Sequence, residues 1–188
     1  MSARQRLIDT TIELVRRHGV GSTSVSQILE HSGLARRTLY LNFPDGKPEL
    51  IAAATESAAA SFTSMLEEMV ADGDPIATVD AFVRAWEAVL GDSDYLAGCP
   101  MVAVTLGGSE APAAAAVAAN AFAQWVGLMA SRFERAGLDP AAAQDLATTV
   151  VAAIEGAVIM SVAARSPIPL QRAGRDLAVL VGARLAGG

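Results

Sequence analysis

The chain has 188 residues and a formal net charge of −6 at pH 7, with two histidines and a single cysteine. One cysteine excludes an internal disulfide framework, and two histidines beside it are too few for a Cys/His zinc site. Hydrophobic residues make up 52% of the chain, many of them alanine, whereas aromatic residues make up only 5%. Since the long runs of alternating β-branched and aromatic residues that strands require are missing, we expect an all-α protein without a metal ion or cofactor.

The negative net charge conceals a split along the chain. Residues 1–50 contain seven basic and five acidic residues, which leaves +2 there and −8 for residues 51–188. A basic front on an acidic remainder places any contact with phosphate in the front segment.

Residues 4–18 repeat apolar side chains at helical spacing, and Gly19 follows as a stop. A second helix is predicted to begin after Ser24, because Ser24 and Gln27 have the spacing of a capping box. This helix ends at Gly33, which can adopt the positive φ that a tight turn between helices requires.

A third helix is predicted over residues 34–43, where apolar anchors fill one face and Arg36, Arg37 and Tyr40 are left for the other. Residues 44–46, Pro-Asp-Gly, end this helix, and a fourth one follows. A short amphipathic helix with exposed arginines at its front fits the major groove of DNA. The three helices therefore predict a helix-turn-helix head.

These residues resemble the DNA-binding head of TetR-family repressors. The matching features are the link Gly21–Thr23, the short helix ending in Gly33, and Thr38-Leu39-Tyr40-Leu41-Asn42-Phe43 ahead of Lys47. The sequence Phe43-Pro44-Asp45-Gly46-Lys47, together with Gly98-Cys99-Pro100, resembles the LmrA/YxaF-like subgroup. Two positions depart from the family pattern. Ala35 stands where a Ser or Thr usually opens the recognition helix, and Asn42 stands where His is usual.

The resemblance implies nine helices in two parts, with a DNA-binding domain at residues 1–47 and a ligand-binding and dimerisation domain at residues 48–188. It implies a cytoplasmic, ligand-responsive regulator: a repressor that binds a palindromic operator in double-stranded DNA as a homodimer and is released by a small apolar effector. Its DNA contacts would be Ser24, Arg36, Arg37, Thr38, Tyr40, Asn42 and Lys47. The alternatives are a solvated arginine pair, a half-buried packing role for Tyr40, and an ordinary surface lysine.

Six apolar helical stretches follow the head, at residues 50–70, 76–90, 101–106, 112–136, 140–164 and 170–186. They are separated by Asp72-Gly73-Asp74-Pro75, by an irregular stretch at residues 91–100, and by further Gly- and Pro-containing breaks. With the three helices of the head they make nine.

The central stretches carry most of the large apolar side chains, which suits a pocket for a small molecule. Ordinary core packing would use the same residues. The predicted lining is Phe82, Trp86, Tyr95, Met101, Phe122, Trp125, Met129 and Glu155. Glu155 could pair with a cationic ligand or with an arginine such as Arg132 or Arg165.

Residues 147–164 are long enough to span a membrane, but Glu155 lies at their middle. A carboxylate at that depth costs at least ~2.5 kcal/mol, so we expect a core or subunit-contact helix and no membrane partner. The last two helices are rich in Ala, Gly and Val, which favours a four-helix contact between two identical chains.

Two other classes of protein are less well supported. An enzyme is disfavoured because no nucleophile–base pair, metal cluster or phosphate-binding glycine loop occurs. A helical small-molecule-binding protein with a degenerate DNA-binding head remains open because of Ala35. Cys99 is expected to pack as a small hydrophobic residue, since no basic neighbour in the sequence would activate a sensing thiol.

Overall fold

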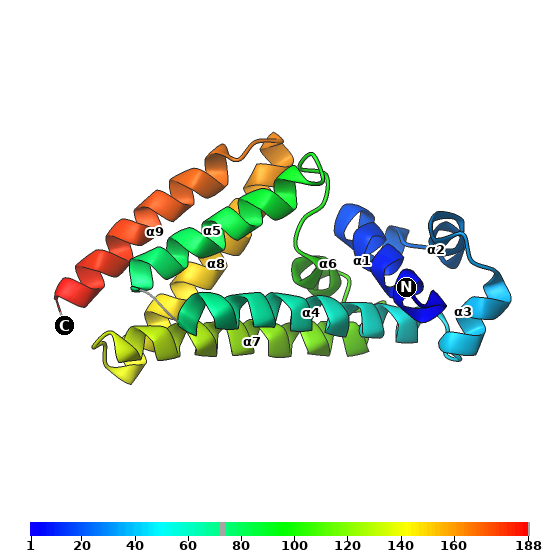
Figure 1. The fold of residues 1–188 in the computed structure, drawn as a ribbon, viewed down its shortest axis with the longest axis horizontal. Coiled ribbons are helices and arrows are strands. Elements are labelled where there is room, and N and C mark those ends of the chain that lie inside the picture. The colour runs from blue at the N-terminus through cyan, green and yellow to red at the C-terminus, as the bar shows by residue number, and fades with distance from the viewer. Residues whose placement is uncertain (72–73, 188) are drawn as a thin grey trace. The chain divides into compact units, whose positions relative to one another are not determined.

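The computed structural model describes residues 1–71 and 74–187, which form nine α-helices and no strand (Figure 1). This confirms the all-α prediction for the described part of the chain. Of the predicted break at residues 72–75, Asp72 and Gly73 lie outside the described residues. The helices are α1 (Ala3–Ser22), α2 (Val25–Ser32), α3 (Arg36–Asn42), α4 (Lys47–Ala71), α5 (Pro75–Gly91), α6 (Pro100–Leu106), α7 (Pro112–Arg135), α8 (Pro140–Ala164) and α9 (Ile168–Ala186).

The helices begin where the sequence offers caps. Asp74 and Asp139 each accept hydrogen bonds from two backbone N–H groups at the starts of α5 and α8, and a proline follows each aspartate. Such a carboxylate satisfies donors that have no partner within the helix, and proline loses nothing at the first helical position. Gly19 departs from helical geometry inside α1, with a φ of 76°, at the position where the sequence predicts a stop.

The chain forms two compact units, Met1–Ser61 with Cys99–Ala121 and Phe62–Gly98 with Phe122–Gly188. Both α4 and α7 contribute to each unit. The units therefore group segments that are distant in the sequence.

In the first unit, α1 packs against α2, α3 and α6. One apolar cluster holds α1 to α4 together, and its members are almost fully buried. They are Leu7, Ile8, Leu14, Ile28, Leu39, Phe43, Leu50 and Ala54. Only Leu39 and Phe43 anchor α3 in this cluster. The other side chains of α3 are therefore not needed for this packing.

In the second unit, α5, α8 and α9 run side by side (Figure 1). The contact between α5 and α9 is close at Gly174, where an added Cβ would lie 2.8 Å from Val83 Cγ2. The C-terminal part of α7 is tied to α4 by the Arg135 guanidinium, which donates to the Val70 carbonyl at 3.0 Å.

Two helices, α7 and α8, are long and apolar enough to cross a membrane by length and composition alone. Half of the most apolar 18-residue stretch of α8 is buried within the protein, and Glu155 lies on its buried side. Core packing explains such a helix without a membrane.

Candidate DNA-binding surface and effector site

The outer face of α3 combines charge with apolar surface. Leu39 and Phe43, four residues apart, point into the core of the first unit and are almost fully buried. Arg36, Arg37 and Leu41 are exposed, and Arg37 and Leu41 lie on the side of the helix opposite Leu39. Because Leu39 and Phe43 anchor α3 in the core, the helix displays the two arginine side chains to solvent.

The turn between α2 and α3 is held from both sides. The predicted capping box is confirmed, because Ser24 accepts from the Gln27 N–H while the Gln27 side chain accepts from the Ser24 N–H. At the other end, Gly33 has a φ of 64°, which a side chain would strain. The Arg6 guanidinium donates twice to the Ser32 carbonyl, at 2.9 and 2.7 Å.

Tyr40 is 43% exposed. One edge of its ring lies over Gly46, where an added Cβ would come within 3.1 Å of the Tyr40 Cε1 atom. The ring thus packs on the turn before α4 while keeping nearly half of its surface accessible. Packing and a DNA contact are compatible in this position.

Two other residues that the sequence predicts to contact DNA already donate hydrogen bonds within the protein. The Lys47 ammonium donates to the Val20 carbonyl at 3.0 Å, and the Asn42 amide donates to the Thr38 carbonyl at 2.8 Å. Lys47 has three protons and uses one of them here, so two remain for a phosphate. Asn42 is half-buried and stabilises its own helix.

Arg4 is a cation beside α3 that the sequence interpretation missed. Its guanidinium carbon lies 5.1 Å from the centre of the Phe43 ring, and the residue is exposed. A cation over an aromatic face is attracted to the ring, which holds Arg4 near the end of α3. Nothing in the local sequence marks this contact.

The second unit contains an aromatic cluster built from α4, α5 and α7. Phe62 lies between the two tryptophans, with ring centres 4.8 Å from Trp86 and 5.5 Å from Trp125. Phe122 meets Trp125 edge to face at 5.3 Å. Sequence reasoning placed Phe122 and both tryptophans in a pocket but missed Phe62.

The two indole N–H groups of this cluster differ. Trp125 donates to the Thr63 hydroxyl at 3.0 Å, whereas Trp86 is fully buried and its Nε1 has no hydrogen-bond partner among the described residues. An unpaired buried donor costs about 1–3 kcal/mol. Trp86 therefore offers a donor to any acceptor that enters beside it.

The other residues of the predicted pocket divide between the two units. Met101, on α6, belongs to the first unit, whereas Phe82, Tyr95, Met129 and Glu155 belong to the second together with the aromatic cluster. Tyr95 and Phe122 are half-buried, and the remaining members of the predicted set are buried.

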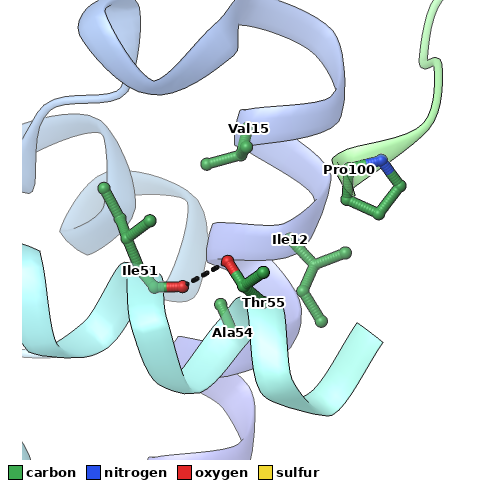
Figure 2. Close-up of a pocket in the computed structure, with 6 residues that line it drawn as sticks. All are labelled: Ile12, Val15, Ile51, Ala54, Thr55 and Pro100. Atoms are coloured by element: carbon green, nitrogen blue, oxygen red, sulfur yellow. Dashed lines mark hydrogen bonds between the residues drawn. The ribbon is translucent and has the colours of Figure 1, made fainter. Parts of the chain in front are cut away.

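The cavity drawn in Figure 2 lies in the first unit, and none of the predicted pocket residues lines it. Its lining is Ile12, Val15, Ile51, Ala54, Thr55 and Pro100. The volume is about 10 Å³, which is enough for roughly one water molecule. Its one hydroxyl, on Thr55, donates to the Ile51 carbonyl at 2.7 Å. This cavity is too small for an effector.

Cys99 has a basic neighbour in space that the sequence does not reveal. Burial lowers the pKa of the Arg16 guanidinium, while Glu13 and Cys99 act in the opposite direction. Cys99 itself is buried, as expected of a small hydrophobic residue.

Comparison with known proteins agrees with this arrangement. Residues 7–54 match the model of bacterial regulatory proteins of the tetR family, and residues 75–176 match the C-terminal domain of LmrA/YxaF-like transcriptional regulators. The chain is 33% identical over 189 residues to the uncharacterised HTH-type transcriptional regulator Rv0196 of Mycobacterium tuberculosis, which covers 97% of this chain and 95% of that protein. The chain belongs to the TetR family of transcriptional regulators.

Two further TetR-family proteins extend the comparison. HTH-type transcriptional regulator LmrA of Bacillus subtilis is 25% identical over 171 residues, covering 89% of this chain and 90% of LmrA. The crystal structure of regulatory protein TetR from Rhodobacter sphaeroides has the same fold, with a TM-score of 0.85 over 94% of this chain and 97% of that one at 22% identity. This TetR-family chain is therefore a DNA-binding transcriptional regulator and not an enzyme.

Within this TetR-family head, the two departures have visible structural consequences. Ala35 has the extended backbone of an N-cap, with φ −74° and ψ 149°, but supplies no side-chain hydrogen bond to the start of α3. Asn42 bonds within α3 instead. The recognition helix thus depends on its apolar anchors more than on its cap.

Proposed function

We propose that this regulator is a cytoplasmic repressor that binds a palindromic operator as a homodimer and leaves it when a small apolar effector binds. Residues 1–47 contact DNA, and residues 48–188 bind the effector and the second copy. The observation that carries this proposal is the exposure of Arg36 and Arg37 on α3, a helix that Leu39 anchors in the core.

The DNA contacts have distinct roles. Arg36 and Arg37 meet guanine edges or phosphates, since a guanidinium can donate two parallel hydrogen bonds to either. Thr38 and Tyr40 contact phosphate or base from the same helix. Ser24 and Lys47 contact the phosphate backbone of DNA. They lie at the starts of α2 and α4, and the N-terminus of a helix attracts anions.

The effector site centres on the aromatic cluster of the second unit. Tilted rings of Phe62, Trp86 and Trp125 suit a flat apolar molecule, and the unpaired Trp86 N–H suits a molecule that also carries one hydrogen-bond acceptor. Phe82, Tyr95, Phe122, Met129 and Glu155 complete the site within this unit.

The dimer contact uses α8 and α9. Large apolar side chains remain exposed on both helices, among them Ile159 and Met160 on α8 and Val179 on α9. Small residues on the exposed side of α8, such as Gly156 and Ala163, would let a second helix approach closely. A two-fold axis there would present two heads to successive major grooves, about 34–36 Å apart.

Selection from random double-stranded DNA tests the operator half of the proposal. We expect enrichment of an inverted repeat whose half-sites are separated by one or more helical turns. The double variant Arg36→Ala/Arg37→Ala serves as the matched control and should enrich nothing. Failure of the wild-type protein to enrich any sequence would overturn the repressor function.

Intrinsic fluorescence tests the effector half. Trp86 and Trp125 are the only tryptophans in the chain, so the emission reports on the aromatic cluster alone. Apolar aromatic ketones are screened beside the parent hydrocarbons, which lack the acceptor. We expect ketones that quench emission to release labelled operator as well. Quenching without any effect on operator binding would contradict effector control.

A helical small-molecule-binding protein with a degenerate head is the second candidate. The uncapped start of α3 at Ala35 is the observation that favours it. It predicts effector binding by the fluorescence assay together with equal affinity for all DNA sequences.

A further inference from the structure

Leu41 is unlike the large apolar residues that anchor α3 and its C-cap. Leu39 and Phe43 are buried in the core, whereas Leu41 is 71% exposed. A single exposed leucine is ordinary on a protein surface. Leu41, however, lies on the helix proposed to bind DNA and contributes almost nothing to the packing of the head. Its side chain is therefore accessible to a base.

Leu41 shares an exposed face of α3 with Arg37. Residues four apart on a helix are neighbours, so Arg37 and Leu41 form one column and Arg36 and Tyr40 form another. A full turn of helix advances about 5.4 Å, somewhat more than the ~3.4 Å between stacked base pairs. A base contacted by Leu41 therefore lies within one or two base pairs of the DNA position contacted by Arg37.

The chemistry of the major groove narrows what Leu41 can recognise. Each base pair presents donors and acceptors there, and a leucine side chain can bond to none of them. Thymine alone among the four bases also presents a C5-methyl group. Contact with that methyl is the sequence-dependent interaction open to an apolar side chain.

We propose that Leu41 reads a thymine C5-methyl group in each half-site, beside the position contacted by Arg37. This inference rests on the proposed operator binding and adds one specified base to it. Burial of one methyl group corresponds to about fourfold in affinity for each half-site, and roughly fifteenfold for a symmetric dimer.

Replacement of thymine by uracil in the selected operator tests the proposal. The substitution removes only the C5-methyl group and keeps every hydrogen-bonding atom. Fluorescence anisotropy measures the affinities of the wild-type protein and of Leu41→Ala for the thymine and uracil operators. We expect uracil at one symmetric pair of positions to lower the operator affinity of the wild-type protein roughly fifteenfold. On the same pair, Leu41→Ala should bind thymine and uracil operators equally.

Leu106→Ala is the matched control, since Leu106 is 82% exposed and lies at the end of α6. It should retain the wild-type ratio between the two operators. Circular dichroism should show unchanged helix content for both variants, because both side chains are mainly in solvent.

Three results would overturn the proposal. Wild type could tolerate uracil at every thymine of the half-site, or Leu41→Ala could remain as sensitive to uracil as wild type. Leu41→Ala could also change the molar mass found by light scattering, which would make Leu41 a protein contact. The operator function survives all three, provided that selection yields an inverted repeat and the Arg36→Ala/Arg37→Ala variant does not bind it. If selection yields no repeat, both proposals fail.

Discussion

At the scale of single residues, the head is held by side chains that bridge long stretches of sequence. Arg6 bonds to the Ser32 carbonyl across 26 residues, and Lys47 bonds to the Val20 carbonyl across 27. Both acceptors are carbonyls in the last turns of helices, and the Val20 carbonyl also accepts from the Thr23 N–H at 3.2 Å. These two cations therefore fix the positions of α1, α2 and α4 before any DNA is present.

Replacement of Arg6 tests this structural role. Arg6→Met keeps most of the apolar stem but removes both hydrogen bonds to Ser32, so we expect the head to lose about 1–2 kcal/mol of stability. Native-state hydrogen exchange at the amides of α2 and α3 measures the loss directly. Arg4→Met removes an equal charge from the same helix and should leave exchange in α2 nearly unchanged. Similar exchange in the two variants would show that the bonds to Ser32 contribute nothing.

The Thr63 hydroxyl provides a second test at this scale. Thr63→Val preserves shape but leaves the buried Trp125 N–H without its acceptor, which should lower stability by about 1–3 kcal/mol. The midpoint of thermal unfolding is compared with that of Thr149→Val, whose hydroxyl bonds within its own exposed helix surface. An equal midpoint for both variants would count against the bond between Thr63 and Trp125.

At the scale of elements, α3 is the least self-sufficient helix of the head. It has seven residues and no side-chain cap, and it is held by the burial of Leu39 and Phe43. Ala35 nevertheless has the backbone geometry of a capping residue. A hydroxyl at this position would meet the unpaired N–H groups at the start of the helix without a change in conformation.

Ala35→Ser should therefore stabilise the head by about 1 kcal/mol and raise the midpoint of thermal unfolding. Ser24→Ala is the natural comparison, because it removes an existing cap and should lower stability by a similar amount. If Ala35→Ser leaves the midpoint unchanged or lowers it, a missing cap is not what limits α3.

The elements themselves were largely predictable, because their signals are local. Helical periodicity, the capping box at Ser24 and the positive φ at Gly33 depend on residues a few positions apart. The bonds of Arg6 and Lys47 were not predictable, since their partners lie more than twenty residues away. The same reason explains why Phe62 was missed, because its aromatic partners come from α5 and α7. The assignment of DNA and effector contacts to individual residues remains a prediction.

At the scale of the whole molecule, the proposed binding to a palindromic operator requires two heads and therefore a second copy of the chain. The exposed apolar residues of α8 and α9 are costly in a monomer and useful in a contact between copies. An effector can change operator binding only if it has different affinities for the DNA-binding and released conformations of the dimer.

The double variant Ile159→Glu/Met160→Glu tests the proposed dimer contact through α8 and α9. Two carboxylates in each copy would face each other across a two-fold contact, so we expect a monomer by light scattering at micromolar concentration and a large loss of operator affinity. Leu106→Glu, which adds a charge at an exposed leucine of α6, should remain dimeric. A monomeric wild-type protein would contradict a symmetric operator complex.

Operator recognition is measured most directly by fluorescence anisotropy of the protein titrated onto its selected operator and onto scrambled DNA, at two salt concentrations. We expect tight binding to the operator alone and a steep loss of affinity at higher salt, because phosphate contacts release counterions. Arg37→Ala should weaken operator binding severely. Equal, weak binding of the wild-type protein to both DNAs at both salt concentrations would show that it does not recognise this operator.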